Sequence, residues 1–508
     1  MPTTPSEPVL YDVLVIGAGP AGLAAATTAA GLGAHVALLD AAARPGGQYW
    51  RHRAGDDGRL HHDWGKFRAL RTSLDAAVAD GRIAYLSDHP CWHLERVPNL
   101  APAGSASTAA TPAIPATADA AVFIAHVVHA GADTEVRART VVLATGAYDR
   151  QLPFPGWTLP GVITAGGAQA LLKGQGVVAG KRIVVAGTGP FLFPVAVGLL
   201  HAGAEVAGVY EAGSPTAMLR HPVTAARNAS KLIEGAGYMA TLLRNRVPYR
   251  TRRTVIAAHG ETEVTGVTTA ALDAEWRAIP GTEEQVACDT VATGYGFTPQ
   301  VELAADLGCA MAMDADGSLA VTADETGRSS VDGAFVAGEA RGVGGSALAV
   351  VDGRIAGLHA AASVTGAQVP PARLATLARL RAPLRAFADL LPVAFPVKPG
   401  WRTWVHDDTT VCRCEEVPAT ALRDAVTEMG AEDARSAKLF ARAGMGLCQG
   451  RVCGYAASGL VAQACGREVT ADDLHSTIRR PIAWPVTLGA LAAGNPDGPI
   501  GAPGSNPR

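Results

Sequence analysis

The sequence predicts an α/β protein with two dinucleotide-binding βαβ units, followed by a small domain that carries clustered cysteines. Two glycine fingerprints, at residues 17–22 and 187–192, each follow an apolar strand and open a helix. Four of the eight cysteines lie in one stretch, residues 412–453. The chain has 508 residues, which is enough for about three domains.

The first fingerprint has the full context of a dinucleotide site. It joins an apolar strand at residues 11–16 to an alanine-rich helix, and a second strand at residues 35–39 ends in an acid. In this motif the glycines allow a tight turn, close approach of a pyrophosphate and helix–strand packing, and the acid binds the adenosine ribose. The N–H groups and the dipole at the start of the helix favour phosphate. The predicted binding residues are Gly17, Gly19, Gly22 and Asp40.

The second unit has a degraded fingerprint. Strands at residues 182–186 and 205–210 flank a helix and repeat the βαβ pattern, but Leu192 replaces the third glycine. Glu211 ends the last strand, where it is placed to bind an adenosine ribose and would repel a 2′-phosphate, so NAD is favoured over NADP. Two interpretations stay open: a domain that binds NAD(H), or a retained domain that binds no nucleotide.

The clustered cysteines read C-x-C, thirty-three intervening residues, then C-x4-C. Two close pairs can place four thiolates on one centre, and all-thiolate sites suit iron–sulfur clusters or structural zinc. Neighbouring Gly444, Gly446 and Gly450 let backbone N–H groups approach such a centre. Disulfides are disfavoured because nothing in the sequence suggests export. The predicted metal ligands are Cys412, Cys414, Cys448 and Cys453.

The composition argues against nucleic-acid binding, export and membrane insertion. The net charge is −3, and no basic patch favours nucleic acid. Residues 1–8 lack the charged and apolar segments of a signal peptide. The longest apolar stretch, residues 13–39, is interrupted by five glycines and a proline, so no transmembrane segment is predicted. We therefore expect a cytoplasmic protein that does not bind nucleic acid.

Three further segments resemble flavin-binding motifs of two-dinucleotide-binding-domain flavoproteins. They are the Gly-Gly-Gln sequence at residues 46–48, a strand and turn at 141–147, and the second FAD motif at 334–339. In that last motif an acidic residue, usually Asp, contacts the ribityl group of FAD. The present sequence has Glu339 at this position. The resemblance implies FAD at the first fingerprint, in a glutathione-reductase-like domain with the second Rossmann-like domain inserted. It adds as FAD-binding residues Gly47, Gln48, Thr145, Gly146, Gly338 and Glu339.

The cysteine stretch resembles the BFD-like [2Fe–2S] domain, which is related to bacterioferritin-associated ferredoxin. The resemblance rests on residues 411–417 and 442–453. It implies one [2Fe–2S] cluster on the four cysteines. Disulfide reductases of the flavoprotein superfamily carry a cysteine pair near the Gly-Gly sequence or in the second domain. Residues 46–61 and 161–287 contain no cysteine, so no such dithiol relay is available.

Together, these motifs are similar to the large FAD-containing subunit, termed α or A, of bacterial heteromeric amine and amino-acid dehydrogenases. This family includes the A subunit of opine oxidase, the B subunit of hydrogen cyanide synthase and the flavin subunit of hydroxyproline and proline dehydrogenases. The most distinctive stretches are residues 44–48, 144–150, 152–162 and 479–482.

The resemblance implies an electron-transfer subunit with FAD and a [2Fe–2S] cluster. In such complexes a D-amino-acid-oxidase-like β subunit oxidises the C–N bond of a secondary amine or amino acid of the opine, hydroxyproline or proline, glycine or sarcosine class. Some also contain a small ferredoxin-like subunit, while a quinone or respiratory carrier accepts the electrons. The sequence shows no self-evident base or nucleophile constellation, so catalytic residues are left unassigned.

Two alternatives stay open beside this interpretation. One is a self-sufficient NADH-dependent reductase that passes electrons from FAD to the cluster. The other is a docking scaffold without enzymatic activity, in which the four thiolates hold zinc or a cluster for stability alone.

The order of motifs predicts how the chain is divided. The FAD-binding domain is expected in two parts, on either side of the NAD-like domain. The predicted segments are 9–155 (FAD-binding, with a mobile insertion at 98–120), 156–292 (NAD-like Rossmann), 293–364 (FAD-binding), 365–410 (connection), 411–475 (BFD-like) and 476–508 (C-terminal extension with a disordered end).

Overall fold

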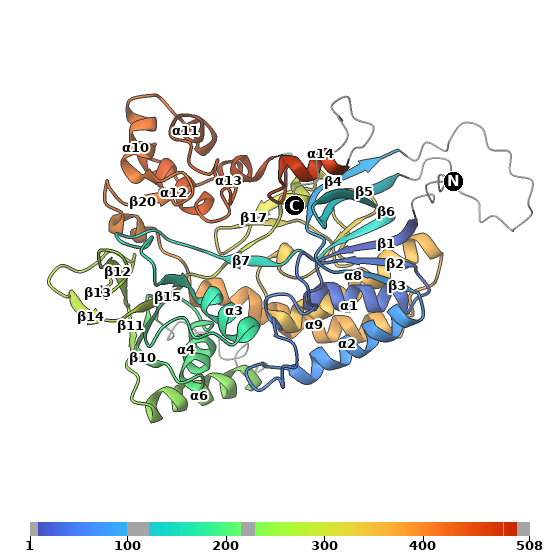
Figure 1. Cartoon of the computed structure of the whole chain (residues 1–508), viewed down its shortest axis with the longest axis horizontal. Helices are drawn as coiled ribbons and strands as arrows, with labels where there is room; N and C mark the ends of the chain where they lie inside the picture. Colours follow the sequence, from blue (N-terminus) through green and yellow to red (C-terminus); the bar gives the residue numbers. More distant parts are fainter. Residues whose placement is uncertain (1–8, 99–120, 215–228, 481, 495–508) are drawn as a thin grey trace, which may run out of the picture.

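The computed structural model describes residues 9–98, 121–214, 229–480 and 482–494. Two sheet-based domains lie side by side, and a smaller helical domain lies against both (Figure 1). Almost all of the insertion expected at residues 98–120, and the end expected to be disordered, lie outside the described residues.

The first domain is built on a seven-stranded sheet. Its order is β3-β2-β1-β6-β5-β4, with β19 paired to β6 beside that path. The pairs among β1, β2, β3, β6 and β19 are parallel, whereas β5 pairs antiparallel with β4 and β6. The strands are Leu10–Ile16 (β1), Val36–Leu39 (β2), Ile83–Leu86 (β3), Cys91–Val97 (β4), Val122–His129 (β5), Ala132–Leu143 (β6) and Ala334–Val336 (β19). The parallel strands are largely buried, as expected where helices or other elements cover both faces.

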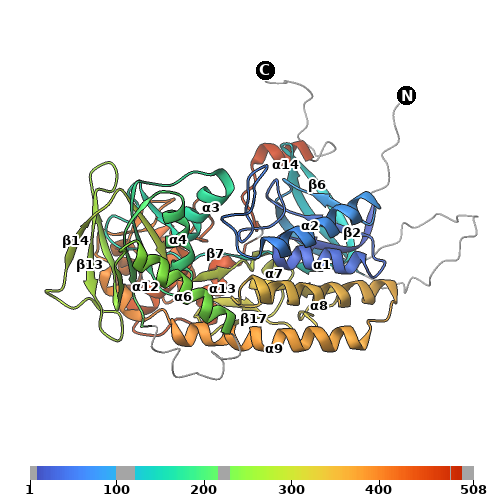
Figure 2. The same ribbon diagram turned by 90° about the horizontal axis from the view of Figure 1, so that it is seen from below.

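Helices α1 (Pro20–Ala30) and α8 (Ser346–Thr365) pack tightly on one face of this sheet. A β-carbon added at Gly353 would lie 2.1 Å from the carbonyl oxygen of Ala21, so only glycine fits there. Helix α2 (Trp64–Ala79) flanks α1, and α9 (Pro371–Ala394) runs beside α8 (Figure 2).

Among the described helices, α8 alone is long and apolar enough to cross a membrane by length and composition. Its apolar window is 61% buried within the protein, against α1, α9 and the sheet. Packing in the core therefore accounts for the apolar character of this helix.

The second domain is built on a five-stranded parallel sheet, in the order β11-β10-β9-β15-β8. Helices α3, α4 and α6 cover one face, and a three-stranded antiparallel sheet, β12-β13-β14, packs on the other. The elements are Val162–Thr164 (β8), Ala165–Gln175 (α3), Arg182–Gly187 (β9), Leu192–His201 (α4), Glu205–Glu211 (β10), Ala229–Arg244 (α6), Tyr249–Thr251 (β11), Arg253–His259 (β12), Gly266–Ala271 (β13), Glu284–Ala287 (β14) and Thr290–Gly294 (β15).

A two-stranded ribbon joins the two sheet domains. The chain leaves the first domain through β7 (Ala147–Asp149) and returns through β16 (Phe297–Pro299), and these strands pair antiparallel. It then forms Glu302–Asp306 (α7), Met311–Met313 (β17), Leu319–Val321 (β18) and, after β19, Gly338–Arg341 (η2). Strand β19, which completes the first sheet, follows the second domain in the sequence. The second domain is therefore inserted into the first, and the predicted fold class is confirmed.

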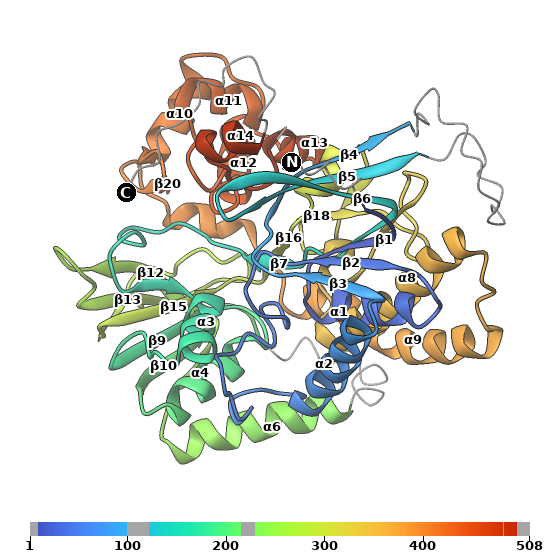
Figure 3. The same ribbon diagram turned by 45° about the vertical axis from the view of Figure 1, so that its right-hand side comes forward.

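The C-terminal helical domain contacts both sheet domains (Figure 3). The indole Nε1 of Trp157, in the second domain, donates to the carbonyl oxygen of Thr410 (2.5 Å). The backbone N–H of Ala483 donates to the carbonyl oxygen of Trp92, on β4 of the first domain (2.6 Å). The elements of the C-terminal domain are Pro399–Trp404 (η3), Thr410–Cys412 (β20), Val417–Pro418 (β21), Ala419–Thr427 (α10), Ala434–Ala441 (α11), Gly454–Ala464 (α12) and Ala471–Ile478 (α13). The chain then continues to Leu488–Gly494 (α14), which packs on β6 of the first domain.

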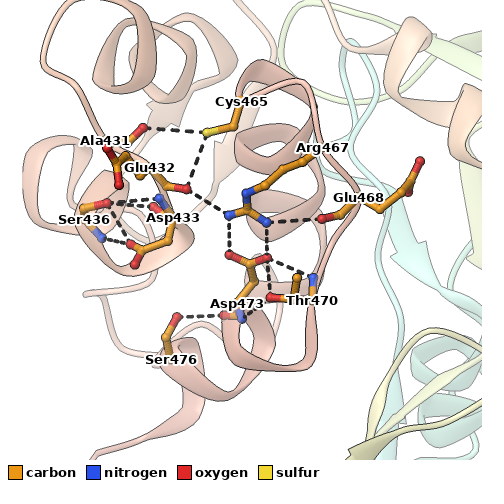
Figure 4. Close-up of polar contacts among 10 residues, drawn as sticks. All are labelled: Ala431, Glu432, Asp433, Ser436, Cys465, Arg467, Glu468, Thr470, Asp473 and Ser476. Atoms are coloured by element: carbon orange, nitrogen blue, oxygen red, sulfur yellow. Dashed lines mark hydrogen bonds and ion pairs between the residues drawn. The ribbon is translucent and has the colours of Figure 1, made fainter.

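An ion pair between half-buried Arg467 and buried Asp473 holds the helices of this domain together (Figure 4). Arg467, just after α12, donates to both carboxylate oxygens of Asp473 on α13, at 2.6 and 2.8 Å. The same guanidinium donates to the carbonyl oxygen of Glu432, which precedes α11. Burial by itself would raise the pKa of Asp473, but the hydrogen bonds from Arg467 and Thr470 lower it to about 2.

Asp473→Asn should loosen the C-terminal domain, because a neutral amide cannot accept both of the hydrogen bonds that the buried carboxylate accepts from Arg467. We expect the free energy of local opening of α12 and α13 to fall by about 1–3 kcal/mol. Amide hydrogen–deuterium exchange measures this directly. Asp472→Asn, at an exposed position next to it, is the matched control and should exchange like the wild type. Unchanged protection in Asp473→Asn would show that the pair contributes little.

Candidate functional site

The first fingerprint forms a turn that has no space for side chains at two of its glycines. Gly17 has φ +104°, and a β-carbon there would lie 2.4 Å from the carbonyl oxygen of Ala144. A β-carbon at Gly22 would lie 1.7 Å from the carbonyl oxygen of Gly17. The start of α1 is therefore pressed onto the turn, and its free N–H groups face the position where a pyrophosphate would lie.

The predicted Gly-Gly-Gln segment lies against this turn. The N–H of Gly46 donates to the carbonyl oxygen of Ala18 (2.7 Å). Gly47 has φ +60°, and a β-carbon there would lie 2.8 Å from the Cα of Gly19. The structure thus brings Gly19 and Gly47 together, and Gln48 follows with an exposed side chain.

Asp40 closes the site from the end of β2. Its Oδ2 accepts a hydrogen bond from the N–H of Ala18 and its Oδ1 one from the N–H of Ala42, both at 2.8 Å. Burial raises the pKa of Asp40, and these two donors oppose the rise. A carboxylate has about four acceptor positions, so Asp40 keeps capacity for the hydroxyls of a ribose.

The turn after β6, residues 144–147, is termed here the FAD-closing turn, and both it and the second FAD motif approach the first fingerprint. Thr145 Oγ1 donates to the carbonyl oxygen of Gln300 (2.6 Å), and the Gln300 N–H donates to the carbonyl oxygen of Gly146 (2.9 Å). Gly338, at φ +72°, starts η2, and a β-carbon there would lie 2.8 Å from the Cβ of Ala21. Both motifs therefore converge on the fingerprint and the start of α1.

Glu339 is turned toward the start of α8. Its carboxylate accepts hydrogen bonds from the N–H groups of Gly345 (2.8 Å) and Gly344 (3.3 Å). Burial raises the pKa of Glu339 to about 7, although both donors act in the opposite direction. The carboxylate thus closes the turn before α8, and contact with a ribityl chain stays a prediction.

The second fingerprint differs from the first in two ways. Helix α4 starts at Leu192, three residues after Gly189, whereas α1 starts directly after Gly19. The Leu192 side chain is buried and fills the space beside Gly294 on β15. The helix is therefore set back from the place where a pyrophosphate would bind, which weighs against nucleotide binding.

The acid of the second unit is mostly engaged within its own domain. Glu211, 1% exposed, accepts hydrogen bonds from Thr188 Oγ1 (2.7 Å) and from the N–H groups of Gly189 (2.9 Å) and Gly213 (2.7 Å). Burial raises the pKa of Glu211, and these donors oppose the rise. Three of its acceptor positions are filled, one more than in Asp40, so less capacity is left for a ribose.

The four predicted cysteine ligands lie at one edge of the C-terminal domain. Cys412 ends β20, Cys414 follows in an exposed turn, Cys448 lies in the loop after α11 and buried Cys453 precedes α12. Cys453 is within hydrogen-bond range of both Cys412 and Cys448, and Cys448 also contacts Cys414. The N–H of Gly444 donates to the sulfur of Cys412 (3.3 Å).

These contacts favour thiolates at two of the positions. The hydrogen bond from Cys453, supported by backbone N–H groups, lowers the pKa of Cys412 to about 6 and that of Cys448 to about 5. The pKa of Cys453 is raised, chiefly because its thiol serves both neighbours as donor. Thiolates are the form that binds metal.

The arrangement of the sulfurs bears on which metal centre fits. Within the described residues, no three His, Cys, Asp or Glu side chains converge as the ligands of a single ion would. The thiol contacts instead form a series, from Cys412 through Cys453 and Cys448 to Cys414. Four thiolates in such a series fit a [2Fe–2S] cluster, which spreads its ligands over two irons, and they also fit one tetrahedral zinc.

Comparison with known proteins decides the family. Residues 11–363, more than half of the chain, match the pyridine nucleotide-disulphide oxidoreductase family. The chain belongs to this family. Residues 410–463 match the BFD-like [2Fe-2S] binding domain. The predicted cysteine domain and the assignment as an FAD-dependent oxidoreductase are confirmed.

Individual relatives indicate which kind of enzyme subunit the chain resembles. It is 34% identical to the A subunit of opine oxidase from Agrobacterium tumefaciens (strain Ach5), over 95% of the chain and 91% of that protein. It is 32% identical to the HcnB subunit of hydrogen cyanide synthase from Pseudomonas aeruginosa, over 89% of the chain and 93% of that protein. The alpha subunit of sarcosine oxidase from Corynebacterium sp. (strain P-1) matches at 30% identity over 45% of its own length. The resemblance to the flavin subunits of heteromeric dehydrogenases is thereby confirmed.

A solved structure shows the same fold over nearly the whole chain. L-proline dehydrogenase from P. horikoshii superimposes with a TM-score of 0.64 at 20% identity, covering 96% of this chain and 80% of its own. The domain architecture, including the C-terminal helical domain, therefore has a counterpart among solved structures.

Sequence reasoning missed the residues that connect the two sites. Arg150, 2% exposed, lies with its guanidinium 4.4 Å from the ring centre of Tyr455, which follows the last cysteine ligand. Arg451 pairs with Glu302 across the same boundary. The position of Arg451 between two ligand cysteines was visible in the sequence, but its partner lies about 150 residues away and carries no motif.

Gly22→Ala should abolish retention of FAD, because the added methyl group would overlap the carbonyl oxygen of Gly17 and push α1 off the turn. Flavin absorbance per chain after gel filtration measures the effect. Gly235→Ala is the matched control: Gly235 also lies in a helix, but open space surrounds it, so flavin content should not change. Normal flavin content in Gly22→Ala would contradict the proposed site.

Proposed function

We propose that the chain is the FAD- and [2Fe–2S]-containing electron-transfer subunit of a heteromeric dehydrogenase. The complex oxidises a secondary amine or amino acid of the opine, proline or hydroxyproline, glycine or sarcosine class. One observation carries the proposal: the same chain holds a complete first dinucleotide site and a cluster of four thiols, and contacts connect the two. The matched relatives support it, since each is named as a subunit of a larger enzyme.

Oxidation of the C–N bond is assigned to a partner subunit of the D-amino-acid-oxidase type. Several histidines of the described chain are engaged with neighbouring carboxylates or backbone: His93 with Asp306, His126 with Glu95, and His52 with the carbonyl of Trp50. These are structural contacts and form no base poised at a pocket. A small ferredoxin-like subunit, together with a quinone or respiratory acceptor, completes the proposed complex, and a cytoplasmic location remains an expectation.

The purified protein should contain about two irons and two acid-labile sulfides per chain. Cys448→Ser should lose the cluster and retain FAD, because the flavin motifs lie in another domain. Cys465→Ser is the matched control: that thiol lies outside the two cysteine pairs and donates to backbone carbonyls of residues 431 and 432, so iron content should be unchanged. Metal analysis and visible absorption report both results. One zinc and no iron in the wild type would reject the cluster.

The isolated chain should oxidise amino acids or opines poorly, and co-expression with its partner subunits should restore activity. Dye reduction and quinone reduction, measured for the chain and the complex, test this division of work. Amine-dependent turnover by the isolated chain at the rate of the complex would place the substrate pocket here. Rapid bleaching of the flavin by NADH alone would favour the self-sufficient reductase instead.

A further inference from the structure

A short series of contacts joins the FAD-closing turn to the loop between α11 and α12, residues 442–453, which is termed here the cysteine loop. The carbonyl oxygen of Gly146 accepts a hydrogen bond from the Gln300 N–H (2.9 Å). Two residues further on, the Glu302 carboxylate pairs with the Nε of Arg451 (3.0 Å). The backbone N–H and Nη1 of Arg451 donate to the carbonyl oxygen of Cys448, at 3.1 and 3.2 Å. Every step from the flavin motif to a cluster ligand is a covalent segment or a polar contact.

The ion pair in this series is shielded from solvent. The side chains of Glu302 and Arg451 are 12% and 14% exposed. Burial raises the pKa of Glu302, and the Arg451 charge opposes the rise. In such surroundings each charge depends strongly on the other. Removal of Glu302 leaves Arg451 buried without its ion-pair partner, and removal of Arg451 leaves Glu302 with only the more distant charge of Arg480.

Arg451 and the neighbouring Arg480 hold the cysteine loop in different ways. Arg480 fastens the loop from within the C-terminal domain, through Gln449 Oε1 (2.8 Å) and the carbonyl oxygen of Thr477 (2.5 Å). Arg451 instead reaches out of that domain to Glu302, at the start of α7 in the first domain. Arg480 therefore stabilises the conformation of the loop, and Arg451 holds the loop against the first domain.

We propose that the Glu302–Arg451 ion pair holds the cysteine loop on the FAD-closing turn and lies on the electron route from flavin to cluster. Both are positioning residues, and the proposal rests on the proposed function, since it assumes that both cofactors are bound. With both cofactors bound, the reduced flavin would supply one electron at a time and the oxidised cluster would accept it, with no bond made or broken in the protein. A quinone-type acceptor would take each electron from the cluster before the next transfer, and the flavin would release its protons to solvent.

The two charges should act on the cluster in opposite directions. Reduction adds a negative charge to the cluster, which the guanidinium of Arg451 stabilises and the carboxylate of Glu302 destabilises. Glu302→Gln leaves the guanidinium unopposed and should raise the reduction potential. Arg451→Gln removes the nearer of two cationic groups that act on Glu302, the other being Arg480, and should lower it. A purely structural role would not separate the two variants in this way.

The test uses the full-length holoprotein. The flavin is photoreduced without oxygen, the appearance of the reduced cluster is followed by electron paramagnetic resonance, and potentials are obtained by redox titration. We expect both variants to slow transfer on the order of tenfold, with opposite shifts in potential. Arg451→Lys keeps the charge and changes the geometry, so it should slow transfer while the potential stays near the wild-type value. Glu428→Gln removes an exposed charge just after α10, outside both cysteine segments, and should leave the transfer rate unchanged.

A further measurement does not need the cluster. In the cluster-free Cys448→Ser background, Glu302→Gln and Arg451→Gln should be non-additive in hydrogen exchange of the cysteine loop, because they remove the same contact. Additive effects there, or wild-type transfer rates with unchanged potentials in the loaded variants, would overturn the proposal and leave the proposed function standing. Absence of flavin-to-cluster transfer in the wild type would overturn the proposed function itself.

Discussion

The close packing of the first turn of α1 is the constraint on which most of this structure depends. That turn lies between the fingerprint loop, η2 and α8, and glycine occupies each point of closest approach. β-carbons at Gly22, Gly338 and Gly353 would come within 1.7, 2.8 and 2.1 Å of their nearest neighbours. The same contacts form the core of the first domain and shape the flavin site, so the fold and the cofactor site cannot vary independently.

The two βαβ units show how one motif can give different binding capacity. In the first, Asp40 accepts two backbone hydrogen bonds, and the helix begins directly beside the turn. In the second, Glu211 accepts three, and Leu192 sets the helix back while filling the space beside Gly294. The second domain therefore keeps the stability of the motif, and its acid and its helix are less suited to a nucleotide.

The C-terminal domain is attached to the two sheet domains by polar contacts at separate places. Trp157 anchors it to the second domain, while Arg150 and the Glu302–Arg451 pair hold it to the ribbon and the first domain. Within it, the Arg467–Asp473 pair fixes the helices that carry the cysteine loop. A one-electron centre depends on a constant distance to its donor, and contacts on two sides restrict the motion that would change that distance.

The sequence by itself determined the fold class and the family, and it predicted the residues of both candidate sites, because all of these depend on local patterns. Gly17 to Gly22 after an apolar strand, and the C-x-C and C-x4-C pairs, each carry their physical reason within a few residues. Only the tertiary structure decided how Glu339 and Glu211 use their carboxylates, and which residue pairs with Arg451. Hydrogen-bond partners such as Gly345, and ion-pair partners such as Glu302, are set by packing between segments that are adjacent only after folding, and no spacing rule in the sequence specifies them.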